Sequence, residues 1–491
     1  PTPSAPAIRI FNNLALTEEC TIRQYDAPVA FLNATPSKDT VCLPIPGYKV
    51  LDGQGRPMYP RLKKSLYGSV EASARWHEVL TDFFRAIGFT QMIHEPTCFI
   101  HKEKKIGVLI YVDDLEIAYK NIEDKDWLEE KMIDAFDMKL EGGLNNYLGV
   151  RYTKTEAGYF ADQEERIINL AERLNVADPK HISNSPYQNV KNFNTATLTR
   201  DPKEIQKLSE TYRFELPQII GELLYIAKAS RPDISVAVSI VASHIAYASA
   251  EVFRATLQIV RYLYSNKKLG MHITADTSIT GVRAWVDASY MSNKDAHGYS
   301  RYGYVIMSGD TIIDWKTSHL PKSSSSTTAA EYHALALCAI ETVHVSDVYK
   351  EMKEALTGIK TTLDVQLGIN TETDDKIHIY EDNKPAVAAA YSNKGSTLQT
   401  RQMAARFWQL QELVAKGILS IDHIPGEKQI ADFFTKRMQP GKFKNLRQFF
   451  VRTIEDIYPR IQEEIKEKKG TDQVGELELG DRWGNEDIPA G

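Results

Sequence analysis

The sequence predicts an α/β (α+β) protein in which two mixed regions of strands and helices flank a helical connector. The first observation is a series of short, apolar, strand-forming runs between Thr97 and Lys120. The second is a stretch from about Glu164 to Lys268 in which apolar residues recur at helical spacing. The third is the return of alternating strand and helix patterns from Gly281 onward. We expect domains at 1–165, 166–275 and 276–440, followed by an acidic, largely disordered tail at 441–491.

The elements of the first region follow from local pattern and from glycine stops. Helical spacing predicts one helix over 69–89 that stops at Gly88, and another over 125–143 that ends at Gly142 and Gly143. The remaining apolar runs predict a strand over 21–32 that leads into a turn, two or three strands over 97–120 with the aspartate pair 113–114 at a hairpin turn, and a hairpin over 146–163.

The connector and the second region contain longer periodic segments. The connector is predicted to hold helices over 217–249 and 251–268. The second region begins with strand patterns and then alternates helices with strands. Its predicted strands cover 281–290, 300–307, 311–317, 376–383 and 419–425, and its predicted helices cover 326–356, 384–392, 401–417 and 428–438.

Composition limits the class of protein. The 491 residues are 43% hydrophobic and 25% charged, which is typical of soluble globular protein with two to four domains. No apolar run reaches the ~18 residues of a membrane span, and four widely spaced cysteines favour a reduced intracellular protein without zinc. The net charge of -6 lies in residues 455–491, with eleven acidic and five basic residues, so the neutral body is compatible with a nucleic-acid partner.

Asp113 and Asp114 stand side by side within the strand pattern of Gly107–Lys120. Adjacent carboxylates repel each other and lose hydration near a core, so their cost must be offset. Divalent metal ions offset it, and two ions ~3.5–4 Å apart are the usual device for phosphoryl transfer. Asp26, where a strand gives way to a turn, is the best further ligand. The alternative is a plain hairpin with polar turn residues.

Four separated acids mark the second region. Asp287 lies in a predicted strand, Glu331 in the first turns of a helix, Asp382 at a strand end and Asp432 in a late helix. Carboxylates from several elements can hold two divalent ions when the fold brings them together. The alternative for each acid alone is an ordinary surface residue.

The motifs around these acids resemble the reverse transcriptase and ribonuclease H region of copia-type retrotransposon Pol polyproteins. The first region contains "YDAPVAFLN", "RLKKSLYG", "YVDD" and "LNNYLGVRY", and the connector contains "IIGELLYIAKASRPDI". The second region contains "WKT", "AEYHAL", "EDNKPA" and "ADFFTK". These motifs follow the order of the family over roughly residues 21–440. The resemblance implies a reverse-transcriptase palm with a helical thumb or connection, followed by a ribonuclease H-like mixed-sheet domain.

The resemblance also implies a function and a set of site residues. The chain would copy RNA into DNA and degrade the RNA strand of the hybrid. It would use two Mg²⁺ (or Mn²⁺) ions in each active site. Its partners would be an RNA template, a DNA primer, an RNA–DNA hybrid and deoxynucleoside triphosphates, with no membrane. The location would be the cytoplasm, in a virus-like particle, or the nucleus. The implied metal ligands are Asp26, Asp113 and Asp114 for polymerisation, and Asp287, Glu331, Asp382 and Asp432 for cleavage. Phe31 would pack under the nucleotide sugar, and Leu66, Tyr67 and Gly68 would support template and nucleotide.

Some positions depart from the family pattern. Ala329 replaces a glutamate two positions before Glu331, and His423, before Pro425, is interpreted as structural. The sequence lacks an initiator Met, so we expect a chain that is processed or excised from something longer. The residues before Asp26 carry only Arg9 and Arg23, so we expect a truncated fingers segment: either other Pol segments or a second subunit supply the fingers, or this copy is incomplete. Two alternatives stay open: a decayed or domesticated copy that binds nucleic acid, and a ribonuclease H with an inert palm.

Overall fold

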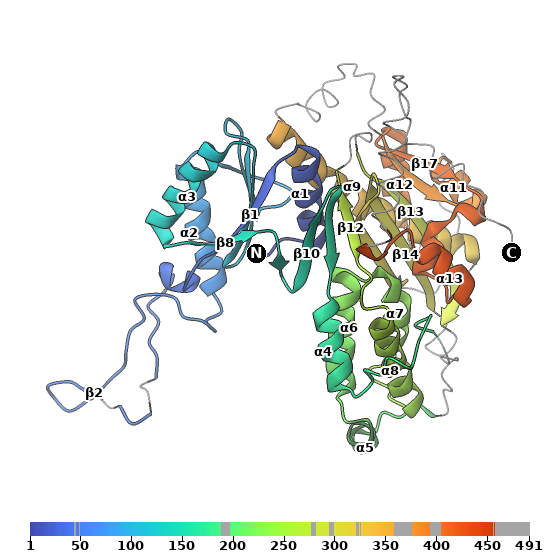
Figure 1. The fold of residues 1–491 in the computed structure, drawn as a ribbon, viewed down its shortest axis with the longest axis horizontal. Helices are drawn as coiled ribbons and strands as arrows, with labels where there is room; N and C mark the ends of the chain where they lie inside the picture. The colour runs from blue at the N-terminus through green and yellow to red at the C-terminus, as the bar shows by residue number, and fades with distance from the viewer. Residues whose placement is uncertain are drawn as a thin grey trace. The chain divides into compact units, whose positions relative to one another are not determined.

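The computed structural model of the chain describes residues 1–43, 46–48, 50–187, 197–275, 281–293, 299–320, 324, 326–357, 376–392, 404–454 and 456. The chain divides into two compact units, whose elements are labelled in Figure 1. The first unit comprises 1–144 and 348–371, and the second comprises 145–347 and 372–491. Each combines β-sheet with helices, which confirms the α/β (α+β) class. The domain limits at 165, 275 and 440 stay a prediction.

The first unit is built on a six-stranded antiparallel sheet with the strand order β4-β5-β6-β7-β1-β8. Its strands are β1 (Thr21–Asp26), β4 (Thr90–Gln91), β5 (Cys98–His101), β6 (Ile106–Tyr111), β7 (Asp114–Tyr119) and β8 (Lys139–Gly143). Tyr111 pairs with Asp114, so a two-residue turn joins β6 to β7 as predicted.

Helices cover both faces of this sheet. On one face, α2 (Ala72–Ala86) and α3 (Ile122–Phe136) pack Trp76, Leu80 and Met132 against Tyr25 and Leu115 in one apolar core. On the other face, Phe11 of α1 (Ala5–Thr17) lies over Gly107 of β6, where a Cβ atom would approach the Phe11 ring to 2.9 Å. The last residues of α9 (Thr327–Thr357), from Val348 on, belong to this unit.

The predicted C-terminal end of one helix in the first unit was wrong. The helix predicted over 125–143 ends at Phe136, and Asp137 takes a left-handed conformation with φ 53°. Residues Lys139–Gly143 instead form β8, which pairs with β1. Pairing with β1 therefore overrides the local helical pattern of this segment.

The short elements η1 (Ala30–Asn33), β2 (Val50–Leu51) and β3 (Pro57–Met58) lie between β1 and α2.

The second unit begins with a four-stranded antiparallel sheet, in the order β12-β11-β10-β9, and a group of helices. Helix α4 packs on α8, which is distant from it in the chain, and α6, α7 and α8 pack on one another (Figure 1). The predicted hairpin over 146–163 is present as β10 and β11. The elements are β9 (Asn146–Tyr147), β10 (Val150–Thr155), β11 (Gly158–Asp162), α4 (Glu164–Arg173), α5 (Pro202–Tyr212), α6 (Leu216–Ala229), η3 (Pro232–Ile234), α7 (Ser235–Ala242), α8 (Ala250–Ser265) and β12 (Met271–Thr274).

The second unit also contains a mixed five-stranded sheet, in the order β15-β14-β13-β16-β17. The first three strands are antiparallel, whereas β16 and β17 run parallel to β13. Parallel neighbours need a crossover, and between β16 and β17 the described part of the chain contains the helices α11 and α12. The elements are β13 (Arg283–Asn293), β14 (Tyr299–Ser308), β15 (Thr311–His319), α9, β16 (Ile377–Glu381), α11 (Lys384–Ala390), α12 (Ala404–Ala415) and β17 (Leu419–His423).

The chain beyond β17 differs from the prediction in two ways. The helix predicted over 428–438 is two short 3₁₀ turns, η5 (Gly426–Lys428) and η6 (Ile430–Phe434). Part of the predicted tail is ordered, because α13 (Pro440–Arg447) buries Phe443, and Arg452 pairs with Gly270. The rest of the predicted tail, after residue 456, lies outside the described residues. Among the described helices, none combines the length and apolar character that a membrane crossing requires.

Candidate active sites

The structure brings the three acids of the first unit to one end of its sheet. Asp26 ends β1 and pairs directly with Asp114, the first residue of β7. Directly opposed residues of antiparallel strands share a face, so these two carboxylates lie on the same side of the sheet. Asp113 occupies the turn, and its carbonyl oxygen accepts a hydrogen bond of 2.9 Å from the backbone N–H of Ala27.

Electrostatics in this group is unfavourable without a cation. Partial burial and then the charge of Asp113 raise the pKa of Asp26. Burial, followed by the charges of Asp113, Glu141 and Asp26, raises the pKa of Asp114 to about 6. The charged carboxylates are thus destabilised mainly by lost hydration and next by one another. A divalent cation would relieve both effects, so these residues fit a metal site.

The turn between β6 and β7 is strained and is held by a neighbouring helix. Val112 has φ 59°, a conformation that costs a β-branched residue about 1–3 kcal/mol. The indole N–H of Trp76 in α2 donates a hydrogen bond of 2.7 Å to the carbonyl oxygen of Val112. With the bond from Ala27 to Asp113, both turn carbonyls have partners in other elements.

Two of the residues expected to contact the nucleotide meet each other. The rings of Phe31, in η1, and Tyr67 lie 4.6 Å apart, and a backbone bond from Ser65 to Ala34 joins the two segments. Leu66 and Tyr67 are exposed, with 42% and 58% of their surface accessible. Gly68 has φ 91°, which only glycine adopts without strain. The aromatic pair is therefore available to a ligand on its exposed side.

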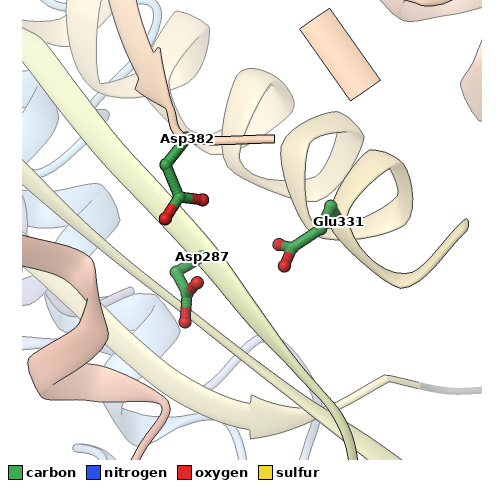
Figure 2. A group of neighbouring side chains, drawn as sticks. All are labelled: Asp287, Glu331 and Asp382. Atoms are coloured by element: carbon green, nitrogen blue, oxygen red, sulfur yellow. The ribbon is translucent and has the colours of Figure 1, made fainter. Parts of the chain in front are cut away.

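The second unit brings three acids together from three elements, as Figure 2 shows. Asp287 comes from β13, Glu331 from the start of α9, and Asp382 follows the last residue of β16. Each offers a carboxylate oxygen, and these oxygens all lie within 4.8 Å of one another. The backbone N–H of Ala288 donates a 2.6 Å hydrogen bond to Glu331 and fixes its carboxylate.

Asp287 and Glu331 are more deeply buried than the acids of the first unit, whereas Asp382 is partly buried. Asp287 is 1% and Glu331 is 4% exposed. Burial raises the pKa of Asp287 to about 6, opposed by Lys436. Burial and then the charge of Asp287 raise the pKa of Glu331 to about 9. Hard oxygen donors that converge in a buried position and repel one another fit a divalent cation such as Mg²⁺.

Asp432 lies beside this group but has different partners. It sits in η6, and its carboxylate accepts bonds from the ammonium groups of Lys436 and Lys442. Lys436 also reaches Asp287, at 3.2 Å, and the hydroxyl of Thr435 donates to the same carboxylate. His423 ends β17, and its Nε2 lies 3.2 Å from the carbonyl oxygen of Asp382. Three of the four predicted acids thus converge on one another, and the fourth, Asp432, is bound by two lysines.

Sequence reasoning missed two buried acids near these groups, and it also missed Lys436, which contacts Asp287 and Asp432. Glu116 is 0% exposed two residues after Asp114, and burial raises its pKa to about 8. Glu381 is 0% exposed beside Asp382, and burial raises its pKa well above the usual range. A charged residue inside the apolar run "LEIAY" was an available signal for Glu116. No local pattern distinguishes Lys436, because its role depends on residues far away in the chain.

Comparisons with known proteins agree with this organisation. Residues 1–186 match the family described as reverse transcriptase (RNA-dependent DNA polymerase). The chain is 26% identical over 91% of its length to the Retrovirus-related Pol polyprotein from transposon RE1 of Arabidopsis thaliana. It is 23% identical over 88% of its length to the Transposon Ty1-JR2 Gag-Pol polyprotein of Saccharomyces cerevisiae. Both matches confirm the predicted resemblance.

The coverage of these matches is uneven. The chain spans 28% of the Arabidopsis protein and 24% of the yeast protein. A solved structure, described as LC11-RNase H1 in complex with RNA/DNA hybrid, matches 31% of this chain and 93% of its own chain. The identity there is 15% and the TM-score is 0.20.

Proposed function

We propose that this chain, as a relative of copia-type retrotransposon Pol polyproteins, is an RNA-directed DNA polymerase with ribonuclease H activity. The observation that carries the proposal is the pair of acid groups on separate sheets. One lies at the β6–β7 turn and one at the centre of the five-stranded sheet. Each group fits divalent cations, and a related polyprotein aligns over 91% of the chain.

The polymerase site would use the residues of the first unit. Asp26, Asp113 and Asp114 would hold the cations, Mg²⁺ or Mn²⁺. Phe31 and Tyr67 would support the sugar of the incoming nucleotide, with Leu66 and Gly68 beside them. When bound, two cations in each site would activate the attacking oxygen and neutralise charge on the phosphate. The bonds from Trp76 and Ala27 would keep the aspartates of the turn in position.

The ribonuclease H site would use Asp287, Glu331, Asp382 and Asp432. The N–H of Ala288 orients Glu331, and burial of Asp287 keeps bulk water away from its carboxylate. An RNA template, a DNA primer, deoxynucleoside triphosphates and an RNA–DNA hybrid would be the partners. Recognition would rest on backbone contacts and shape, with weak sequence preference. Other Pol segments or a second subunit would contribute, in the cytoplasm within a virus-like particle or in the nucleus.

A second candidate function is cleavage of RNA–DNA hybrids without polymerisation. It is favoured by one observation: among the described residues, the group of carboxylates that converge within 4.8 Å belongs to the second unit. A decayed copy that only binds nucleic acid would lack both activities. Primer extension and hybrid cleavage, measured on the same purified chain, separate these functions.

The decisive experiment compares two variants of the full chain. Asp113→Asn removes one charge from the first acid group, and Glu331→Gln removes one from the second. We expect Asp113→Asn to lower primer extension at least about 100-fold, about 3 kcal/mol of barrier, and to leave hybrid cleavage unchanged. Glu331→Gln should lower hybrid cleavage to a similar extent and leave primer extension unchanged.

Asp52→Asn, at a partly exposed residue that pairs with Arg56, is the matched control and should alter neither activity. Wild-type chain that neither extends primers nor cleaves hybrid would refute the proposal. Cleavage without extension that persists after the other Pol segments are added would establish the second candidate. Loss of both activities in either variant, with unchanged circular dichroism, would contradict separate sites.

A further inference from the structure

One cation of the protein already lies between two of the predicted metal ligands. The ammonium of Lys436 is 3.2 Å from Asp287 and also contacts Asp432, four positions earlier in the chain. Asp287 is 1% and Asp432 is 6% exposed, so both carboxylates need an opposite charge. Lys436 therefore supplies, without any added ion, part of the neutralisation that a divalent cation would supply.

A second lysine completes the binding of Asp432. Lys442 in α13 lies 3.1 Å from the oxygen of Asp432 that Lys436 does not contact. Asp432 thus meets an ammonium group at each oxygen, whereas Asp287, Glu331 and Asp382 converge on one another. This difference separates the fourth acid from the other three.

The ammonium of Lys436 can leave this position. The side chain of Lys436 is 41% exposed, so its charged end can swing into solvent on its flexible stem. An exposed ammonium repels an approaching divalent cation and occupies oxygens that the cation would otherwise use. Movement of Lys436 would free one oxygen of Asp287 and one of Asp432 together.

We propose that Lys436 is an internal counter-ion that competes with divalent cations for Asp287 and Asp432. The three convergent acids would then bind the first cation without it, and binding between Asp287 and Asp432 would require Lys436 to move away. The inference rests on the proposed ribonuclease H function for the identity of the cation. Competition predicts that removal of the Lys436 charge tightens cation binding. A purely structural role, in which Lys436 organises the ligands, predicts that its removal weakens cation binding.

The test is Mn²⁺ binding to the full chain without nucleic acid, measured by electron paramagnetic resonance and calorimetry. Lys436→Met keeps the aliphatic stem and removes the charge. We expect it to tighten binding of the weaker Mn²⁺ ion of this site by about tenfold, about 1.4 kcal/mol. Lys436→Arg keeps the charge and should bind Mn²⁺ as wild type does.

Controls distinguish the local effect from a general change in charge. Lys416→Met, at an exposed lysine paired with Glu412, removes the same charge away from the acids and should leave Mn²⁺ binding unchanged. Lys436→Gln offers the same comparison if the Met variant does not fold. Equal or weaker Mn²⁺ binding by folded Lys436→Met or Lys436→Gln chain would overturn the inference. Wild-type Mn²⁺ binding by Glu331→Gln would instead overturn the proposed ribonuclease H site.

Discussion

At the scale of single residues, Asp233 of the second unit is a buried charge with three hydrogen-bond donors. Its carboxylate accepts bonds of 2.9 and 2.7 Å from the guanidinium of Arg231 and of 2.6 Å from the hydroxyl of Tyr262. The side chains of Arg231 and Asp233 are both 0% exposed. Burial alone would raise the pKa of Asp233, but the charge and hydrogen bonds of Arg231 and the bond from Tyr262 lower it.

We predict that Asp233→Asn destabilises the protein by about 3–5 kcal/mol, because the charge of Arg231 is left buried without its partner. The folded pKa lies below the unfolded value of about 3.9, so this stabilisation is complete at pH 7 and is lost as the pH falls through the folded pKa. Urea unfolding of the full chain at pH 7 measures the effect. An unchanged unfolding midpoint would contradict it, and Asp52→Asn, at a partly exposed ion pair, should unfold almost like wild type.

Among single elements, helix α2 and the β6–β7 turn act together. Trp76 is 1% exposed, packs edge-on against Phe136 at 5.2 Å, and directs its indole N–H to the strained turn. A carbonyl shielded from water that loses its hydrogen-bond donor costs about 1–3 kcal/mol. The helix therefore contributes a contact that holds Asp113 and Asp114 in one conformation.

We predict that Trp76→Phe lowers the rate of primer extension roughly 5- to 150-fold, because it keeps an aromatic ring and removes the N–H that holds Val112. Hybrid cleavage should not change. Phe84→Leu is the control: Phe84 is buried in the same helix and core, so it loses packing without touching the turn. If the two variants lose equal stability and equal extension activity, the hydrogen bond has no specific role.

For the whole molecule, each unit has its own core, its own sheet and its own group of acids. Cations that bind the folded second unit stabilise it by mass action, by about 2.7 kcal/mol at a concentration of 100 times Kd. The three convergent acids repel one another in the absence of a cation, so the second unit should respond strongly.

We predict that Mg²⁺ raises the apparent Tm of the full chain, and that Glu331→Gln loses most of this increase. Differential scanning calorimetry with and without Mg²⁺ measures it, and Asp113→Asn should retain the part of the increase that belongs to the second unit. The same Mg²⁺ response in wild type and Glu331→Gln would show that these acids do not bind the cation.

Local sequence patterns predicted many helices and turns correctly, because interactions between residues close in the chain determine these elements. The helix predicted over 326–356 is α9 at Thr327–Thr357, and the turn that bears Asp113 joins β6 to β7 as expected. Where contacts distant in the chain decide, prediction was wrong: Lys139–Gly143 leaves its helical pattern to pair with β1, and Phe443 orders the start of the predicted tail.

By itself, the sequence determined the order of the acids, their place on strands, turns and helices, and the family that the chain resembles. It could do so because periodicity and turn residues act over a few positions. Only the tertiary structure decided which acids meet and what opposes their charge. The bond between Lys436 and Asp287 joins residues 149 positions apart, and the bond from Trp76 to Val112 joins residues 36 apart. Burial and ion pairing depend on such long-range contacts, which no local pattern encodes.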